Sequence, residues 1–230
     1  MWNKIWNQLN DLSTFPVLIL LFSCGLCIRY WSALSKPLKI LAAYLFFNLA
    51  IELGARVTGI LYGQNLPLLH LYTFGEYLVF SLFYREILDA NSIFRRYFAW
   101  ILGIVLSLVV CNTLFLQGIF EFNSYAKTLV QVLIILFALD FAFRDSELEG
   151  LDAARSKTLQ LINAAVLIYY CGSLFIFMSS QFELQMGEAI RILWNINSVL
   201  NLVFQIMILI ALWKAIFNPR KSSSLPEQVS

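Results

Sequence analysis

Charged residues are scarce in this sequence, and their scarcity excludes an ordinary water-soluble domain. Only 13% of the 230 residues are Asp, Glu, Lys or Arg, whereas about 25% is usual in a soluble globular domain. Hydrophobic residues make up 60% of the chain, more than a globule of this length could bury. The net charge of +2 is too small to indicate nucleic-acid binding.

Histidine and cysteine are also rare, which limits the possible chemistry. His70 is the single histidine, so a bis-histidine haem and the multi-histidine centres of some membrane hydrolases and desaturases are excluded. Cys24, Cys27, Cys111 and Cys171 all fall inside long apolar segments, which argues against an external disulfide framework. There is also no paired-histidine metal motif, phosphate loop or nucleophile elbow.

What the sequence does contain is a series of long apolar segments. Each approaches the length needed to cross about 30 Å of hydrocarbon as a helix. Continuous apolar runs such as 101–110 exclude the alternating strands of a membrane barrel. We therefore predict an all-α, polytopic integral membrane protein with seven transmembrane helices. The predicted spans are 15–31, 38–62, 68–88, 97–118, 125–143, 159–179 and 189–217.

The connections between these segments are too short to form a soluble domain. Residues 1–217 are therefore predicted to form a single transmembrane helical domain, and residues 218–230 a short polar cytoplasmic tail. The whole chain is expected to be a multi-pass protein of the cell membrane, either an inner or a plasma membrane, with the lipid bilayer as its main surroundings.

The distribution of basic residues predicts the orientation. Of the 16 Lys and Arg residues, twelve lie beside the first, third and fifth connections or in the tail, and the positive-inside rule places these in the cytoplasm. The N-terminus is then outside and the C-terminus is cytoplasmic. The twelve are Arg29, Lys36, Lys39, Arg85, Arg95, Arg96, Arg144, Arg155, Lys157, Lys214, Arg220 and Lys221.

Polar residues inside the second span recur with helical spacing. Asn48, Glu52 and Arg56 are four residues apart and therefore share one face of the helix. Because Glu52 and Arg56 are one turn apart, they are expected to pair. Ionisable residues at membrane depth are costly and typically have a functional or packing role.

The third span carries a second polar face. His70, Thr73, Glu76 and Tyr77 follow one another at three- and four-residue spacing. The second and third spans are joined by a few residues and must be antiparallel neighbours. We therefore predict that Glu52, Arg56, His70 and Glu76 form one polar cluster in the outer half of the bundle.

The last span adds a third polar face. Arg191, Asn195, Ser198 and Asn201 recur along it. Together with Asn48, Tyr77 and the four residues of the cluster, they are the predicted ligand-binding residues. Amides and hydroxyls in membrane helices also serve as interhelical hydrogen bonds with no further role, and for this helix both interpretations are open.

Two carboxylates and a histidine are suited to proton transfer or metal ligation. Glu52, His70 and Glu76 are accordingly the candidate catalytic residues, although no spacing here is diagnostic of a metal site. The cofactor is unknown.

Three functions are compatible with these patterns. The first is a ligand-binding or sensor-like protein whose outward-facing cavity accepts a small or amphiphilic molecule. The second is an intramembrane enzyme acting on a lipid or isoprenoid through Glu52, His70 and Glu76. The third is a proton-coupled transporter, which ranks last because the chain shows no internal repeat.

The predicted topology resembles that of rhodopsin-like receptors, but no motif of that family is present. A retinal Schiff base would need a lysine near the middle of the last span, where Asn201 lies instead. Lys214 is thirteen residues further along, roughly 20 Å away on the helix axis. Retinal is therefore argued against.

A signal from such a protein would have to pass to a separate partner, since the chain has no predicted output domain. The longest cytoplasmic connection, from Arg144 to Lys157, has mixed charges and is the predicted docking segment for a cytoplasmic protein. A solvated linker without a partner is the alternative interpretation of the same charges.

Overall fold

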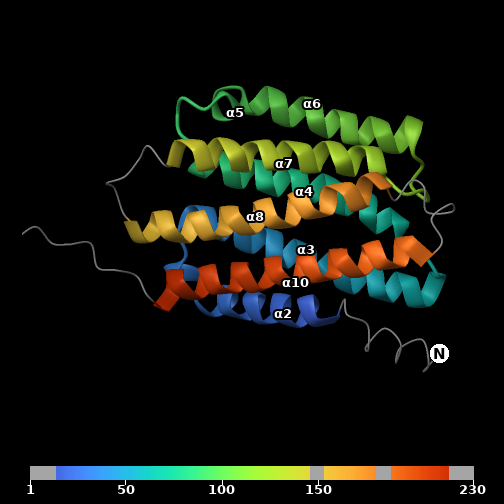
Figure 1. Cartoon of the computed structure of the whole chain (residues 1–230), viewed down its shortest axis with the longest axis horizontal. Coiled ribbons are helices and arrows are strands. Elements are labelled where there is room, and N and C mark those ends of the chain that lie inside the picture. The colour runs from blue at the N-terminus through green and yellow to red at the C-terminus, as the bar shows by residue number, and fades with distance from the viewer. Residues whose placement is uncertain (1–13, 146–152, 180–187, 218–230) are drawn as a thin grey trace, which may run out of the picture.

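The computed structural model describes residues 14–145, 153–179 and 188–217, and this part of the chain is helical apart from short turns, without any β-strand. Within the described residues, six long helices and a shorter apolar one run side by side (Figure 1). The prediction of an all-α architecture is confirmed. The helices and short helical segments are α2 (Thr14–Arg29), η1 (Trp31–Ala33), α3 (Lys36–Tyr62), α4 (Leu66–Ile87), α5 (Ile93–Arg96), α6 (Phe98–Cys111), η2 (Asn112–Leu116), α7 (Ser124–Asp145), α8 (Ala153–Ser179) and α10 (Glu188–Phe217).

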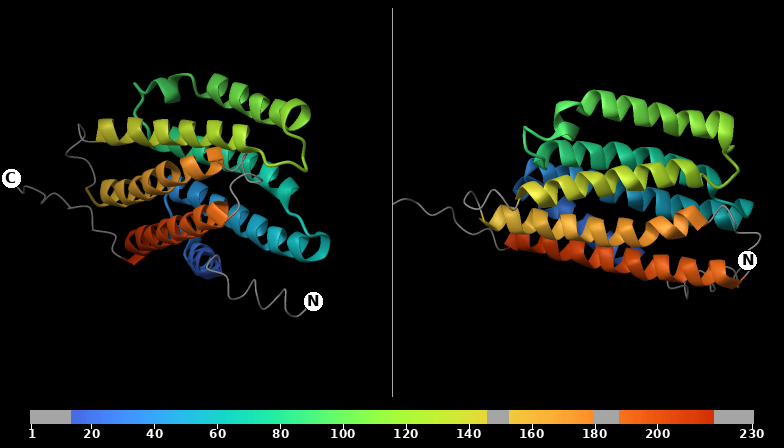
Figure 2. Two further views of the ribbon diagram at one scale, coloured as in Figure 1. Left: turned by 45° about the vertical axis from the view of Figure 1, so that its right-hand side comes forward. Right: turned by 45° about the horizontal axis from the view of Figure 1, so that its top comes forward.

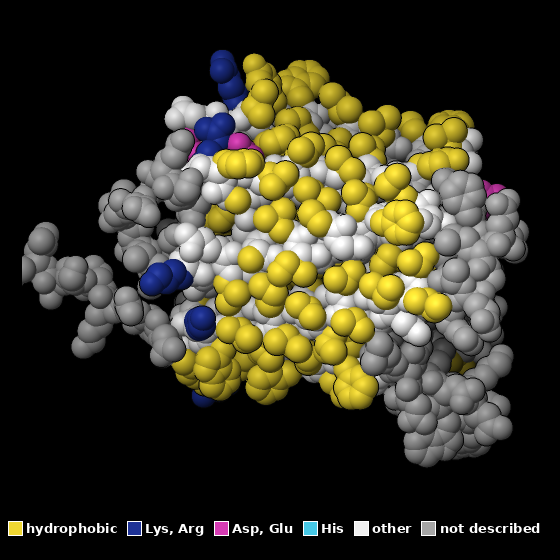
Figure 3. Space-filling view, in the orientation of Figure 1, with side chains coloured by type: hydrophobic (Ala, Val, Ile, Leu, Met, Phe, Trp, Pro, Cys, Tyr) yellow, Lys and Arg dark blue, Asp and Glu magenta, His cyan; other side chains and the backbone are white. Residues whose placement is uncertain are grey.

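The helices are suited to a membrane by length and composition. Six of them, α3, α4, α6 with η2, α7, α8 and α10, are long and apolar enough to cross a bilayer. The first, α2, is apolar but has only 16 residues, or roughly 24 Å at 1.5 Å per residue. Figure 3 shows hydrophobic side chains spread over the visible face of the bundle. Trp100, Phe143 and Phe175 are among the large apolar side chains that are mostly exposed, as expected for a surface that meets lipid.

The boundaries of α3 and α4 follow from local sequence signals. Pro37 and Pro67 lie in the first turns of α3 and α4, where a missing backbone N–H costs nothing and the fixed φ favours a helix start. Gly63 ends α3 with a φ of 74°, the left-handed conformation that glycine adopts without strain. The tight turn at 63–65 places the last turns of α3 beside the first turns of α4.

The order of the helices in space differs from their order in the chain. α8 packs between α7 and α10, while α4 packs against α3, α6 and α7. α2 lies at one edge beside α3 and α10, and α6 lies at the opposite edge (Figures 1 and 2). The central helices α3, α4, α7, α8 and α10 therefore enclose the interior of the bundle.

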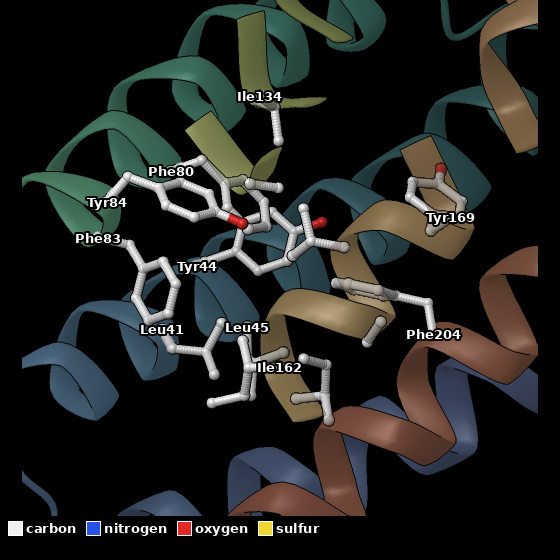
Figure 4. Close-up of a cluster of buried hydrophobic side chains, with 14 of the residues drawn as sticks. Leu41, Tyr44, Leu45, Phe80, Phe83, Tyr84, Ile134, Ile162, Tyr169 and Phe204 are labelled. Atoms are coloured by element: carbon white, nitrogen blue, oxygen red, sulfur yellow. The ribbon is translucent and has the colours of Figure 1, made fainter. Parts of the chain in front are cut away.

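Aromatic rings fill the interior. Tyr44, Phe80, Phe83 and Tyr84 are almost completely buried, and Figure 4 shows them converging with Phe204 from α10. Their packing joins α3, α4 and α10 with aliphatic side chains of α7 and α8.

Buried amides add polar links between helices. Asn163 of α8 donates to the carbonyl of Ala138 on α7 at 3.0 Å and accepts from the hydroxyl of Tyr84 on α4 at 2.8 Å. Gln131 of α7 donates to Ser173 of α8 at 2.8 Å. These are interhelical hydrogen bonds of the kind that membrane bundles use in place of hydrophobic driving force.

The fourth predicted span differs from a regular helix. α6 changes at Asn112 into a π-helical turn, η2, which ends at Leu116. A π-turn admits one extra residue and is often found at functional sites. Here it directs Thr113 toward α4, where its hydroxyl lies 2.8 Å from His70 Nδ1.

Most of the described basic side chains lie at one end of the bundle, with Arg56 of α3 and Lys127 of α7 as the exceptions. Arg29 lies at the end of α2, Lys36 at the start of α3, and Lys214 in the last turn of α10. Figure 3 shows dark-blue side chains toward the end where α8 begins and α10 ends. The amino-terminal residues 1–13 and the tail 218–230 are outside the described residues.

Gly75 permits the close contact of α3 and α4. A Cβ at Gly75 would overlap the ring of Phe47, which is stacked on Tyr72 with an interplanar angle of 3°. We predict that Gly75→Ala destabilises the protein by about 1–3 kcal/mol because the ring must shift, as measured by unfolding in detergent. Gly103→Ala, where no atom lies within 4 Å, is the control and should not destabilise. Adding Phe47→Leu to Gly75→Ala should restore part of the loss, and a fully destabilised double variant would contradict the packing explanation.

Candidate functional site

A cavity of about 430 Å³ lies between α3, α4, α8 and α10. This volume is within the usual range for small-molecule sites. Because the turn between α3 and α4 supplies Asn65, the cavity lies toward the end of the bundle opposite most of the described basic residues. Its lining is Asn48, Ile51, Glu52, Ala55, Asn65, Leu66, Leu68, Leu69, Tyr72, Phe122, Tyr169, Phe177, Trp194, Asn197 and Asn201.

Glu52 supplies the charge of this cavity. It is the only Asp, Glu, Lys, Arg or His among the lining residues in the described part of the chain. Its carboxylate forms no hydrogen bond or ion pair with another described residue. A carboxylate at this depth that is not already paired is available to a ligand.

The expected Glu52–Arg56 ion pair does not form within the described residues. Arg56 points instead toward α2, where its Nη1 donates to the hydroxyl of Thr14 at 3.5 Å. It still acts on Glu52 through its charge. The two residues do lie on neighbouring turns of α3, as their spacing predicts. Because α2 packs against α3, however, the guanidinium of Arg56 contacts Thr14 and not Glu52.

One wall of the cavity is aromatic. Phe122, from the connection between η2 and α7, lies 6.2 Å from Phe177 of α8 and 5.8 Å from Trp194 of α10 between ring centroids. Phe177 and Trp194 are 5.6 Å apart and nearly perpendicular, at 87°. Three segments distant in sequence thus combine their rings here. Trp194 meets the other two rings edge to face, and Phe122 and Phe177 are stacked, both of which are arrangements that aromatic pairs favour.

A completely buried ion pair lies behind this wall. Lys127 Nζ of α7 is 2.5 Å from Glu76 Oε2 of α4, and neither side chain is exposed. The second carboxylate oxygen, Oε1, accepts a hydrogen bond from the hydroxyl of Tyr170 on α8 at 2.9 Å. Two opposite charges and a hydroxyl thereby satisfy one another, as charges buried away from water require.

Aromatic rings complete the surroundings of the Lys127 ammonium. Its Nζ lies 4.4 Å from the ring centroid of Tyr72 and 5.0 Å from that of Phe177, both within the range of a cation–π interaction. Tyr72 and Phe177 also line the cavity. The ion pair is therefore separated from the cavity by two side chains.

Tyrosine hydroxyls lie on both sides of the ion pair. Tyr72, which lines the cavity, shares a hydrogen bond of 3.0 Å with Tyr44 between their hydroxyls. Tyr170 donates to Glu76 at 2.9 Å. Because the ring of Tyr72 also lies 4.4 Å from the Lys127 ammonium, a change at Tyr72 acts directly on the ion pair.

His70 belongs to a different network, beside α6. Its Nδ1 lies 2.8 Å from the hydroxyl of Thr113, and its Nε2 donates to the carbonyl of Glu121 at 3.0 Å. Asn123, two residues later, donates to the hydroxyl of Thr73 at 2.8 Å. This network fixes the connection between η2 and α7 against α4.

The structure therefore does not bring Glu52, His70 and Glu76 together as one catalytic or metal centre. Glu52 lines the cavity, whereas Glu76 forms an ion pair with Lys127 and accepts a hydrogen bond from Tyr170. Both ring nitrogens of His70 have hydrogen-bond partners. No group of three or more His, Cys, Asp or Glu side chains within the described residues is placed to hold a metal ion. The shared helical face of α4 is real, but its residues meet different neighbours because α4 contacts α3, α6 and α7.

The other predicted ligand-binding residues divide between the cavity and elsewhere. Asn48 and Asn201 line the cavity. Tyr77 is buried on the α6 side, where its hydroxyl reaches the carbonyl of Ile101 at 3.4 Å. Asn195 is exposed, and the hydroxyl of Ser198 donates to the carbonyl of Trp194 on its own helix.

Two sequence predictions fall on residues outside the description. The side chain of Arg191 and most of the Arg144–Lys157 connection, at 146–152, are among them. Arg144 itself forms an ion pair with Asp140 of the same helix at 2.8 Å. The predicted docking segment stays a prediction.

Lys127 is the residue that the sequence reasoning missed. Its position near the start of the fifth span suggested a surface charge. The available signal was that an isolated lysine among apolar residues of a span needs a counter-ion, and Glu76 was the carboxylate without an assigned cation. The aromatic residues Tyr72, Phe177 and Trp194 were missed because aromatics are common throughout this chain.

Comparison with protein-family models, with curated proteins and with solved structures gives no match.

The Lys127–Glu76 pair predicts strongly coupled mutational effects. Lys127→Met or Glu76→Gln alone leaves one buried charge uncompensated and should cost about 3–5 kcal/mol of stability, whereas the double variant should lose far less than the sum. Unfolding of the four proteins in detergent measures the coupling. The pair Lys36–Glu86, at 2.8 Å with an exposed lysine and a partly exposed carboxylate, is the matched control, and its coupling should be within about 1 kcal/mol. Equal coupling in the two pairs would contradict the role assigned to burial.

Proposed function

We propose that this protein is a seven-span membrane receptor or sensor that binds a small or amphiphilic ligand in the cavity between α3, α4, α8 and α10. The observation that carries the proposal is the cavity itself: about 430 Å³, with a carboxylate and four asparagines facing aromatic rings. Convergent polar groups in an otherwise apolar and aromatic pocket are typical of ligand sites.

The proposed topology has the N-terminus outside and the C-terminus in the cytoplasm of a cell membrane. The grouping of described basic side chains at one end of the bundle supports it through the positive-inside rule. In this orientation the cavity faces outward, since it lies at the end formed by the turn between α3 and α4. α2 then makes the first crossing, with the bilayer thinned or its flanking residues extended to match its length.

We propose a route by which the presence of a ligand is passed on. Tyr72 borders the cavity, and its ring lies 4.4 Å from the ammonium of Lys127, whose ion pair with Glu76 joins α4 to α7. α7 leads to the Arg144–Lys157 connection, the proposed contact for a separate cytoplasmic protein. A ligand that moves Tyr72 therefore acts on a helix that ends at the proposed partner surface.

The enzyme hypothesis loses its candidate centre. It depended on Glu52, His70 and Glu76 acting together, and these three side chains meet different partners. A ligand-binding function needs only the cavity and the groups that line it.

The orientation can be tested with single cysteines in a variant lacking the four native ones. Gln64→Cys, in the exposed turn after α3, should react with a membrane-impermeant maleimide on intact cells. Ala90→Cys, in the exposed turn after α4, should react only after the membrane is opened. The reverse pattern would contradict the orientation, and labelling of both from outside would contradict the number of crossings.

Ligand access can be tested with indole, a neutral ring that fits a cavity of this volume. We expect indole to raise the unfolding temperature of the purified protein in detergent and to have no such effect on Ala55→Trp, which fills the cavity from α3. Ile104→Trp, at an exposed position on α6, is the control and should respond as the wild type does. An equal response of all three proteins would overturn the proposal that this cavity binds ligands.

A further inference from the structure

The charges around the cavity leave it with one unmatched anion. Glu52 is the only Asp, Glu, Lys, Arg or His among the described lining residues. Lys127 is close, but it is separated by Tyr72 and Phe177, and Glu76 cancels its charge. Arg56 reaches α2 and is not part of the lining. A cation that enters the cavity is therefore attracted by Glu52, and no Lys, Arg or His among the described lining residues repels it.

Two acceptor groups of the lining, the Glu52 carboxylate and the Asn197 side-chain oxygen, have no hydrogen-bond donor within the described residues. A carboxylate only accepts hydrogen bonds. Asn197 Oδ1 is buried and has no hydrogen-bond partner within the described part of the chain, and the residue lines the cavity. A buried acceptor without a donor carries a free-energy cost that a ligand can remove. A ligand with several N–H groups would satisfy both residues.

The aromatic wall favours a positive charge in the same cavity. Trp194, Phe177 and Phe122 are mutually packed beside the cavity, and the faces of such rings attract cations, indole most strongly. Phe177 and Tyr72 already have one ammonium, that of Lys127, within 5.0 Å and 4.4 Å. The rings also provide an apolar surface for the carbon part of a ligand.

From these three features we infer that the ligand of this cavity is a protonated primary amine, held between Glu52, Asn197 and the aromatic wall. The inference rests on the proposed ligand-binding function and names its chemistry. The ammonium group is common to two sources, a free organic amine and the ethanolamine headgroup of a lipid. An anionic ligand would face the Glu52 carboxylate, and a neutral one would leave it unpaired.

Three probes of nearly equal size separate charge from shape. Benzylammonium, benzyl alcohol and benzoate are titrated by calorimetry into the full-length protein in a maltoside detergent. We expect benzylammonium to bind at least about tenfold more tightly than benzyl alcohol, which corresponds to the strength of one charged contact in a desolvated site. Benzoate should bind most weakly.

Two variants assign the effect to the cavity. Glu52→Gln should weaken benzylammonium binding about tenfold or more and benzyl alcohol binding much less, and the unfolding temperature of the variant without ligand verifies that it is folded. Glu86→Gln, which alters the ion pair with Lys36, should change neither affinity. Asn197→Leu should also weaken the binding of benzylammonium more than the binding of benzyl alcohol.

Lysophosphatidylethanolamine and lysophosphatidylglycerol identify the source. Preferential binding of lysophosphatidylethanolamine, and loss of this binding in Glu52→Gln, supports a lipid headgroup as the ligand. Binding of benzylammonium but of neither lipid supports a free amine. Equal affinity for benzylammonium and benzyl alcohol, tighter binding of benzoate, or no ammonium binding from either source overturns the inference. If only the ligand class is wrong, the wild-type protein should still bind indole and Ala55→Trp should not. If the cavity binds no ligand, the wild-type protein should not respond to indole either.

Discussion

The buried ion pair between Lys127 and Glu76 is the interaction on which the centre of this bundle depends. Neither side chain reaches solvent, and the two are 2.5 Å apart. In a low-dielectric interior an isolated charge is far more costly than a matched pair. The pair, with Tyr170 donating to the same carboxylate, therefore fixes the relative positions of α4, α7 and α8 more specifically than apolar packing does.

This constraint also determines the character of the neighbouring cavity. Tyr72 and Phe177 lie against the ammonium on one side and border the cavity on the other. Because Glu76 neutralises Lys127, the lysine does not cancel the charge of Glu52. Two acidic residues that looked alike in the sequence thus have different roles: one is part of the framework, and the other faces a potential ligand.

The polar residues form three separate groups instead of one large cluster. His70, Thr113 and Glu121 hold the connection after η2, the ion pair joins the central helices, and Glu52 lies with the asparagines in the cavity. Each group includes residues of α4 or contacts them, because α4 packs against three other helices. The ring of Tyr72, which lines the cavity and lies 4.4 Å from the Lys127 ammonium, connects the cavity to the ion pair.

The sequence by itself determined the helical class, the positions of the long helices and which residues of the second and third spans are polar. The reason is that the thickness of the hydrocarbon fixes the length of a span, and backbone hydrogen bonding within it requires a helix. It placed α3 within two residues of its observed start and at its observed end, Tyr62. Only the tertiary structure decided which polar residues meet. Lys127 and Glu76 are 51 residues apart, and their contact follows from how α4 and α7 rotate against each other, which helical spacing within one segment does not specify.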